Sequence, residues 1–362
     1  MAERKIVNAW WTLLVPVAGV AASFSLLQSP IPAEMPLTIA GLTVLLAASV
    51  FAAVHHAEVI AARTGEPYGS IVLALAVTVL EVGLILSLML NKPDGGPTIA
   101  RDTVYSGIMI ITTGIIGMSL LLGSRRHFEQ SLRIRGTSSA LAVLTVLAVI
   151  TLVLPNYTVA TAGPTFSKAQ LVMVALTSLL LYCAFLFVQT VRHRTYFLPE
   201  TEFNIQHIAP DMRTVWISVV MLCGALFTVI ILSKALSPLL SQFIDKAGLP
   251  TSFTGVVIAA LVLLPEGIAA VRAAQANRLQ VSINLALGSG LATIGLTIPA
   301  VAFADLYFGL NIILGISPGQ TALLILALFI SAITLSNGRT NILFGAIHLS
   351  IFAMFLLISA VP

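Results

Sequence analysis

Long, nearly uninterrupted apolar runs alternate with short polar stretches along the whole chain. The runs are continuously apolar, whereas the strands of a membrane barrel alternate apolar and polar residues in segments of about ten. A hydrocarbon core about 30 Å thick needs roughly 20 apolar residues per helix. The pattern therefore predicts eleven spanning helices, at residues 6–27, 37–54, 69–90, 103–123, 138–154, 168–190, 214–232, 253–271, 281–304, 319–336 and 340–361.

Two apolar segments are interpreted separately. The stretch 306–315 is too short to span a bilayer, and we expect it to form part of a loop or a re-entrant segment. The first run, Ile6 to Leu27, follows Arg4 and Lys5. It is longer than the roughly 7–15 residues of a signal-peptide core and lacks a clear small-x-small cleavage site. We therefore expect it to be retained as the first helix.

The composition excludes a soluble enzyme. Of the 362 residues, 58% are hydrophobic and 9% are charged, against about 45–50% and about 25% in soluble domains. The net charge of +4 comes mainly from arginines in the loops, so it does not indicate nucleic-acid binding. Both cysteines, Cys183 and Cys223, lie in apolar runs, which argues against a disulfide framework.

The positive charges predict the orientation of the helices. With a cytoplasmic N-terminus, 13 of the 18 Lys and Arg residues fall on the inner side and 5 on the outer side. By the positive-inside rule, this excess predicts a multi-pass protein with its N-terminus in the cytoplasm and its C-terminus outside. We expect the protein in the inner (plasma) membrane of the cell. The outer residues are Lys92, Arg101, Lys168, Lys234 and Lys246, and the inner ones are Arg4, Lys5, Arg63, Arg125, Arg126, Arg133, Arg135, Arg192, Arg194, Arg213, Arg272, Arg278 and Arg339.

Two glutamates lie inside apolar runs. Glu81 is near the middle of the run 69–90, and Glu266 follows Pro265 deep in the run 253–271. A charge at the bilayer centre costs at least about 2.5–3.5 kcal/mol, and neither run offers a Lys or Arg at the same depth. The natural counter-charge is therefore a proton or a metal ion. The alternative is that each glutamate is permanently protonated and hydrogen-bonded between helices.

The two glutamate segments repeat. Tyr68-Gly69 precedes the first and Phe253-Thr254-Gly255 the second, with the glutamate 12 and 11 residues beyond the glycine. Each glutamate falls in the second helix of a five-helix block, and an odd number of helices makes the second copy enter from the opposite side. The sequence thus predicts an all-α polytopic fold of one N-terminal helix and two inverted five-helix repeats. The expected parts are the extra helix 1–30, repeats 31–190 and 214–362, and the cytoplasmic linker 191–213, which is either a plain solvated connection or a cation-sensing loop.

Oxygen-bearing side chains accompany the glutamates. Thr78 lies one turn before Glu81, and polar residues line the helix that follows each glutamate, where Ser106, Asn284 and Ser289 are candidate ligands. A hard cation such as calcium needs more oxygens than two carboxylates supply. Pro265 also leaves the carbonyl of residue 261 without its helical donor. The alternatives are close-packing surfaces of small residues and a simple kink.

Several polar residues precede the third predicted helix. His55, His56 and Glu58 are candidates for a cytoplasmic proton entrance or pH sensor, because histidine titrates near neutrality. Glu66 is a candidate gate. The alternatives are polar residues at a membrane interface and a carboxylate exposed in a turn.

These segments resemble a known family. The run from His56 to Ser70 that leads into the Glu81 helix resembles the first α-repeat of calcium/proton exchangers in the calcium:cation antiporter superfamily. Phe253–Gly267 and Asn284–Pro299 resemble the second α-repeat. Gly338–Asn341 with His348 is similar to the bacterial sodium-potassium/proton and calcium/proton antiporter branch. The resemblance covers essentially the whole chain.

The resemblance implies eleven helices, cation export driven by proton entry, and Glu81 and Glu266 as the shared proton and cation site. In most of the superfamily a Gly-Asn pair stands three to four residues before each glutamate. Here these positions are Val77-Thr78 and Val262-Leu263. The missing amide oxygens weaken a calcium cage and favour monovalent cations.

The sequence therefore predicts a cation/proton antiporter working by alternating access, with calcium, sodium or potassium as the transported cation. It requires no cofactor, and its partners are membrane lipid, inorganic cations and protons. The alternative is a passive cation channel, which has no need of inverted repeats with one buried acid in each. An intramembrane hydrolase is excluded by the lack of an Asp pair in any predicted span and of an HExxH motif.

Overall fold

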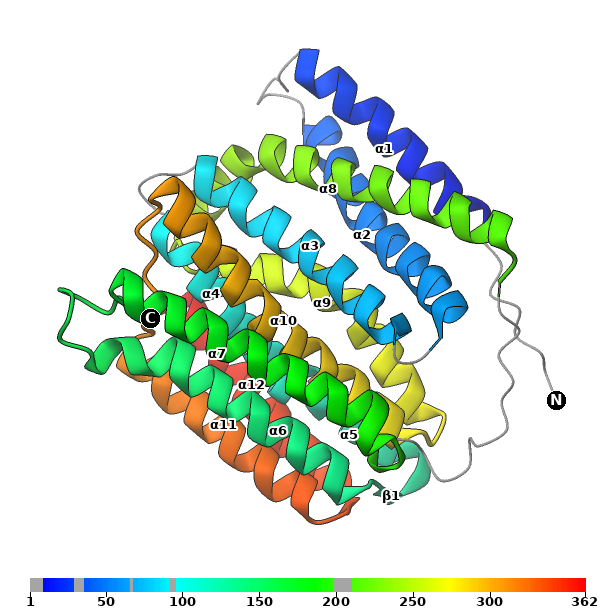
Figure 1. Ribbon diagram of the computed structural model, residues 1–362, viewed down its shortest axis with the longest axis vertical. Coiled ribbons are helices and arrows are strands. Elements are labelled where there is room, and N and C mark those ends of the chain that lie inside the picture. The colour runs from blue at the N-terminus through cyan, green and yellow to red at the C-terminus, as the bar shows by residue number, and fades with distance from the viewer. Residues whose placement is uncertain (1–8, 29–35, 66–67, 92–95, 198–209) are drawn as a thin grey trace. The chain divides into compact units, whose positions relative to one another are not determined.

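The computed structural model describes residues 9–28, 36–65, 68–91, 96–197 and 210–362 (Figure 1). Within these ranges eleven helices are long and apolar enough to cross a membrane, which confirms the predicted number. In chain order the elements are α1 (Trp10–Gln28), α2 (Pro36–Thr64), α3 (Tyr68–Asn91), α4 (Gly96–Met109), η1 (Ile110–Ile115), α5 (Ile116–His127), β1 (Gln130–Ser131), α6 (Ile134–Ala148), η2 (Val149–Val153), η3 (Leu154–Tyr157), α7 (Lys168–Phe187), η4 (Val188–Arg192), η5 (Arg194–Tyr196), α8 (Met212–Lys246), α9 (Phe253–Gln275), α10 (Leu279–Phe308), α11 (Pro318–Ser336), β2 (Arg339–Thr340) and α12 (Ile342–Ala360).

Three of the spans contain π-helical turns. The fourth span is α4, η1 and α5 in succession, and η1 is a π-helical turn of six residues. The turns η2 and η4 lie near the ends of the fifth and sixth spans. A π-turn shifts each backbone hydrogen bond by one residue and often marks a functional position in a helix. Apolar periodicity alone does not reveal such turns.

Several predicted helix ends are wrong. We expect the second span to end at residue 54, whereas α2 continues to Thr64, and the seventh span continues from 232 to Lys246. Hydropathy reports contact with lipid, but a helix continues as long as its backbone hydrogen bonds and side-chain packing hold. Gly65 and Gly248, with φ of 65° and 68°, follow these two helices and adopt the left-handed conformation typical of a helix end.

The described chain forms two compact units. The first comprises residues 1–93 and 203–247, and the second comprises residues 94–202 and 248–362. In the first, α2 packs against α3 and α8, and α1 packs against α8. In the second, α10 contacts α4, α6, α7 and α9. Each unit combines helices from both predicted repeats, and the division into repeats 31–190 and 214–362 stays a prediction.

The stretch 306–315, predicted as part of a loop or a re-entrant segment, begins in the last turn of α10, which continues to Phe308, and is not helical from Gly309 onward. Between Phe308 and Pro318 the chain runs as an irregular segment that buries Ile312, Leu314 and Ile316. The amide of Ile316 donates to the carbonyl of Leu152 over 3.0 Å. The segment ends at a capping box of Ser317 and Gln320 that begins α11. It is a packed loop of the second unit.

Part of the predicted linker 191–213 lies outside the described residues, because 198–209 are not described. At its far end Asp211 caps α8 by accepting a hydrogen bond from the amide of Thr214 over 3.3 Å, and the Thr214 hydroxyl donates to the same carboxylate. Both hydrogen bonds hold the pKa of Asp211 below its usual range, and the bond from the Thr214 hydroxyl has the larger effect. Asp211 therefore serves as a helix cap.

Candidate functional site

Glu266 lies in the middle of the buried face of α9. Its exposed fraction is 8%, and Ala259, Val262 and Ala270 are buried on the same face. The residue is nine positions from the end of α9 at Gln275, a distance of about 14 Å along the axis. The helix continues through Pro265, which has no N–H for the carbonyl of Leu261. The carboxyl group is therefore deep in the span. It lies close to the carbonyl of Leu261, which receives no hydrogen bond from residue 265 of its own helix.

The neighbours of this face come from the fourth span and from α10. A Cβ atom on Gly107 would lie 3.8 Å from Leu263 and 3.5 Å from Thr293, and one on Gly267 would lie 3.2 Å from Ile115. The fourth span therefore runs beside α9 in the same direction, and η1 lies at about the depth of Glu266. The structure thus places a π-turn against the glutamate-bearing helix.

Two predicted ligands lie on these neighbours. Ser106 in α4 is 2% exposed. Ser289 lies ten residues after the start of α10 at Leu279, and α9 and α10 are joined by a short turn. Ser289 and Glu266 are therefore at similar depth. The Ser289 hydroxyl oxygen is buried, and among the described residues it has no hydrogen-bond partner. Ser289 therefore stays a candidate ligand.

Asn284 is engaged elsewhere. Its amide oxygen accepts a hydrogen bond from Gln280 over 2.8 Å, and its amide nitrogen donates to the carbonyl of Phe197. The residue is only five positions from the start of α10, nearer to the helix end than Ser289. Asn284 therefore ties α10 to the segment that follows the sixth span, and we do not include it in the proposed site.

Glu81 occupies the corresponding place in α3. Its exposed fraction is 3%, and Leu84, Ile85 and Leu88 are buried on the same face. Thr78 is also buried, and within the described part of the chain its hydroxyl has no hydrogen-bond partner. Because Glu81 belongs to the first unit and Glu266 to the second, the convergence of the two carboxyl groups stays a prediction.

The glycine of each repeated motif allows two backbones to approach closely. A Cβ atom on Gly69 would lie 2.5 Å from the carbonyl oxygen of Ala61 in α2. One on Gly255 would lie 2.5 Å from the carbonyl carbon of Asp102 in α4. Both distances are far below van der Waals contact, so any larger residue has to displace a backbone. The motif therefore sets how closely each glutamate helix packs.

The predicted proton entrance is part of α2 and not of the loop before the third span. His56 is fully buried, and its Nε2 lies 2.8 Å from the carbonyl oxygen of Thr12 in α1. The His55 ring packs edge-on against it at 5.5 Å between centroids, and Glu58 is exposed. His56 thus joins two helices of the first unit. The predicted gate, Glu66, lies outside the described residues.

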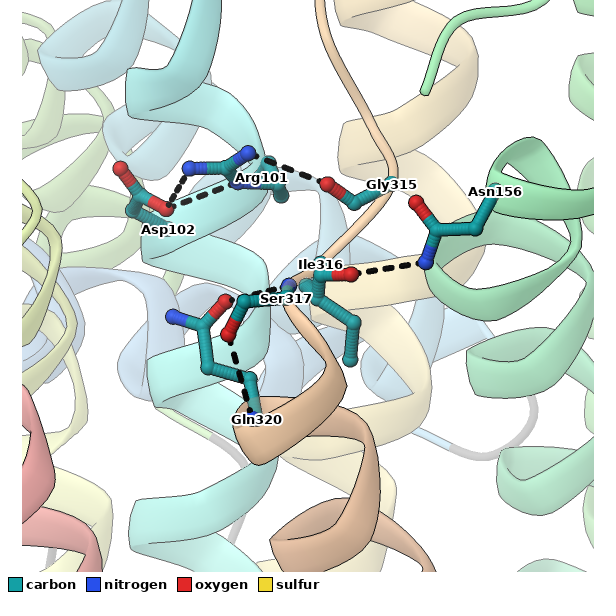
Figure 2. A network of polar contacts seen from close by, with 7 residues as sticks. All are labelled: Arg101, Asp102, Asn156, Gly315, Ile316, Ser317 and Gln320. Carbon is teal, nitrogen blue, oxygen red and sulfur yellow. Dashed lines mark hydrogen bonds and ion pairs between the residues drawn. The ribbon is translucent and has the colours of Figure 1, made fainter. Parts of the chain in front are cut away.

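A buried acid that the sequence analysis missed is Asp102. We expect the fourth span to begin at 103, whereas α4 begins at Gly96, and Asp102 is 3% exposed within it. Figure 2 shows its partners: Arg101 Nε donates to Asp102 Oδ1 over 2.9 Å, and Arg101 Nη1 donates to the carbonyl of Gly315 over 3.0 Å. Asn156 donates to the neighbouring carbonyl of Ile316 over 2.7 Å. The pair fastens α4 to the loop before α11.

We expect Arg101→Gln to destabilise the protein by roughly 3–5 kcal/mol, because it leaves a buried carboxylate without its counter-charge. Thermal unfolding of the purified protein in detergent measures this as a fall in the midpoint. The matched control is Arg339→Gln, since the Arg339–Glu129 pair is 3.8 Å apart and its side chains are 79% and 61% exposed. Equal midpoints for the two variants would contradict the structural importance of the Arg101–Asp102 pair.

A second network that the sequence did not predict involves the π-turn. His348 in α12 is fully buried, and its Nδ1 lies 2.7 Å from the carbonyl oxygen of Thr112 in η1. Its Nε2 lies 3.0 Å from the Thr334 hydroxyl in α11. A carbonyl only accepts, so Nδ1 carries a proton and Nε2 is free to accept from Thr334. The imidazole therefore supports the π-turn that lies beside the Glu266 helix.

No group of three or more His, Cys, Asp or Glu side chains within the described ranges is arranged to hold a metal ion. A cation held by the glutamates consequently needs oxygens from hydroxyl groups, backbone carbonyls or water to complete its shell. The buried hydroxyls of Thr78, Ser106 and Ser289 stay candidates for such oxygens.

The fold and these residues define a multi-pass α-helical membrane protein with one buried glutamate in the second helix of each predicted half. The sequence matches the sodium/calcium exchanger protein family over residues 35–191 and 217–361, and the chain belongs to this family. The match confirms the resemblance to calcium:cation antiporters.

Individual relatives extend over nearly the whole chain. It is 46% identical to y4hA of Sinorhizobium fredii, a protein named as an ionic transporter, over 97% of this chain and 96% of the relative. It is 37% identical to the sodium-potassium/proton antiporter ChaA of Escherichia coli over 96% of this chain and 95% of the relative. The solved Ca2+/H+ antiporter protein YfkE is similar in fold, with a TM-score of 0.71 and 16% identity over 97% of this chain and 99% of that chain.

Proposed function

We propose that the protein exports a cation from the cytoplasm in exchange for protons, with Glu81 and Glu266 as the shared binding site. The observation that carries this proposal is the placement of the two carboxyl groups, each at the centre of a buried helix face, with exposed fractions of 3% and 8%. Relatives named as sodium-potassium/proton and calcium/proton antiporters support the same exchange.

In the proposed cycle, the two carboxyl groups bind either protons or a cation. Deprotonation places up to two negative charges in a pocket of low dielectric constant, where their attraction to a cation is much stronger than in water. Protonation removes this attraction, and the cation leaves. The empty, fully charged site is costly to carry through an occluded state, so only the loaded forms change the side to which the site opens. Exchange follows from this restriction.

We further propose that sodium and potassium are preferred over calcium. Calcium takes six to eight oxygen ligands, and the positions one turn before the glutamates are Val77-Thr78 and Val262-Leu263, which carry no amide. The amide of Asn284 is already used in hydrogen bonds. The sodium-potassium/proton antiporter ChaA, 37% identical over 96% of this chain, supports the same preference.

Everted membrane vesicles with an acidified lumen and a pH-sensitive dye test this ranking. Sodium, potassium and calcium are added separately to vesicles with and without the protein. We expect each cation to release protons from the lumen, with sodium and potassium half-saturating at lower concentrations than calcium. A response to calcium alone would contradict the proposed preference and leave the exchange itself intact.

A passive channel is the competing function, and proteoliposomes separate the two. An exchanger changes the pH of the lumen when a cation gradient is imposed, even with the membrane potential clamped at zero by valinomycin and potassium. A channel moves the cation without moving protons. We expect the lumen pH to change only in liposomes that contain the protein.

A further inference from the structure

An open apolar groove runs along the second unit between the fourth span, α9 and α12. Its volume is about 590 Å3, within the range of roughly 300–1,000 Å3 typical of small-molecule pockets. Met118, Leu264 and Ile268 in its walls are 39%, 46% and 38% exposed. An open apolar groove inside a spanning region is filled by hydrocarbon, because water gains no hydrogen bonds there.

Glu266 does not line the groove, which runs along a neighbouring side of α9. Its lining residues Leu264 and Ile268 stand two positions before and after Glu266, and two residues correspond to a rotation of about 200° around a helix. The groove is therefore separate from the proposed cation site. What fills it packs against the helix that carries Glu266.

One end of the groove is basic. Arg272 and Gln275 line it there, and His127 Nε2 lies 2.9 Å from the carbonyl oxygen of Gln275. This contact brings the last turn of α5, with Arg125 and Arg126, next to the end of α9. The two helix C-termini contribute about −0.5 charge each, against three arginines that are all exposed. The net local charge is positive and suits an anion.

We propose that this groove binds an anionic phospholipid, with one acyl chain along α9 and α12 and the phosphate beside Arg272. The apolar length and the basic end match the two parts of such a molecule. A zwitterionic lipid offers the same chain with a weaker attraction to the arginines. The bound chain supports α9 along a side that does not carry Glu266.

Quenching by brominated lipids tests this site in proteoliposomes of the full chain. A single tryptophan is introduced by Ile268→Trp in a background where Trp10, Trp11 and Trp216 are changed to Phe. The matched control is Ile333→Trp on α11, because Ile333 is 40% exposed and lies outside the groove. Dibromo-phosphatidylglycerol and dibromo-phosphatidylcholine with identical chains are titrated into the bilayer.

We expect phosphatidylglycerol to quench the tryptophan at position 268 at a mole fraction at least fivefold lower than phosphatidylcholine does, and the tryptophan at 333 to show no preference. Arg272→Gln should remove the preference at 268, whereas Arg213→Gln, outside the groove, should leave it. Equal quenching by both lipids at 268 would overturn the proposal, and so would a tryptophan shielded from both by a second copy of the chain.

Native mass spectrometry provides an independent measurement on the chain with its own tryptophans. Wild-type protein should retain one phosphatidylglycerol after detergent activation, and Ala260→Phe, which fills the groove, should lose it. Ala332→Phe on α11 is the control of equal size. Retention of the lipid by a folded Ala260→Phe variant would overturn the assignment. Neither measurement depends on transport, so a failed lipid site and a failed antiport function are distinguishable.

Discussion

Glu266→Gln should abolish exchange. The substitution keeps the size and much of the hydrogen bonding of the side chain but removes the negative charge and the exchangeable proton. At about 4 Å and an effective dielectric constant of 20, one charge pair is worth about 4 kcal/mol, which is roughly a thousandfold in cation affinity. Glu81→Gln should have the same effect, because the proposed site needs both carboxyl groups.

The measurement is proton release from acidified vesicles at saturating sodium, potassium and calcium. Glu129→Gln is the matched control, since the Glu129 side chain is 61% exposed and its carboxylate lies 3.8 Å from Arg339. It should exchange normally. Near-normal exchange by either Glu81→Gln or Glu266→Gln, with each variant present at wild-type levels, would remove that residue from the mechanism.

The same model fixes the sign of the pH dependence. Cations bind the deprotonated carboxylates, so the apparent cation affinity should rise with pH until the pair is fully ionised and then level off. Because two interacting carboxyl groups titrate as a pair, the profile belongs to both residues. In either glutamine variant, any remaining cation binding should have a shallower pH dependence, because only one carboxyl group titrates.

The sequence revealed the two glutamates because a charge in a long apolar run is conspicuous against its cost in the bilayer. It also predicted the eleven helices, since the apolar runs follow the thickness of the membrane. It did not reveal Asp102, which has the same burial, because the run around it is interrupted by polar residues and the helix begins at Gly96, six residues before it. Two features of the sequence could have revealed it. The charges of Arg101 and Asp102 are adjacent and opposite, which suggests an ion pair, and the Gly96-Pro97 pair suggests an earlier helix start, since proline is favoured at the first helical position.

Residue type alone did not reveal how Asn284 is bonded, and its predicted role as a cation ligand stays a prediction. An amide near a buried acid suggests a cation ligand. In the structure, the amide oxygen accepts a hydrogen bond from Gln280, and the amide nitrogen donates one to the carbonyl of Phe197. Likewise, the sequence indicated His348 only through the family resemblance. Its contact with the Thr112 carbonyl in the π-turn joins residues 236 positions apart. Such contacts depend on helix packing, which a periodic pattern within one helix does not specify.

Gly255→Ala should be strongly damaging. The added Cβ would lie 2.5 Å from the carbonyl carbon and 2.7 Å from the carbonyl oxygen of Asp102. These are backbone atoms, so α4 and α9 have to separate near the start of the Glu266 helix. Overpacking a close-packed interface costs about 1–3 kcal/mol, and more where no side chain can move aside.

The expected result is a lower thermal midpoint in detergent together with a loss of at least 90% of the exchange rate. Gly41→Ala is the matched control, because Gly41 lies within α2 and a Cβ there meets no atom within 4 Å. It should stabilise the protein by about 0.5–1 kcal/mol, since alanine is the better helix former. If the midpoint of Gly255→Ala equals that of Gly41→Ala, the close approach of α4 and α9 is not a constraint. The repeated glycine then has to be explained by something other than the packing of the helix that carries Glu266.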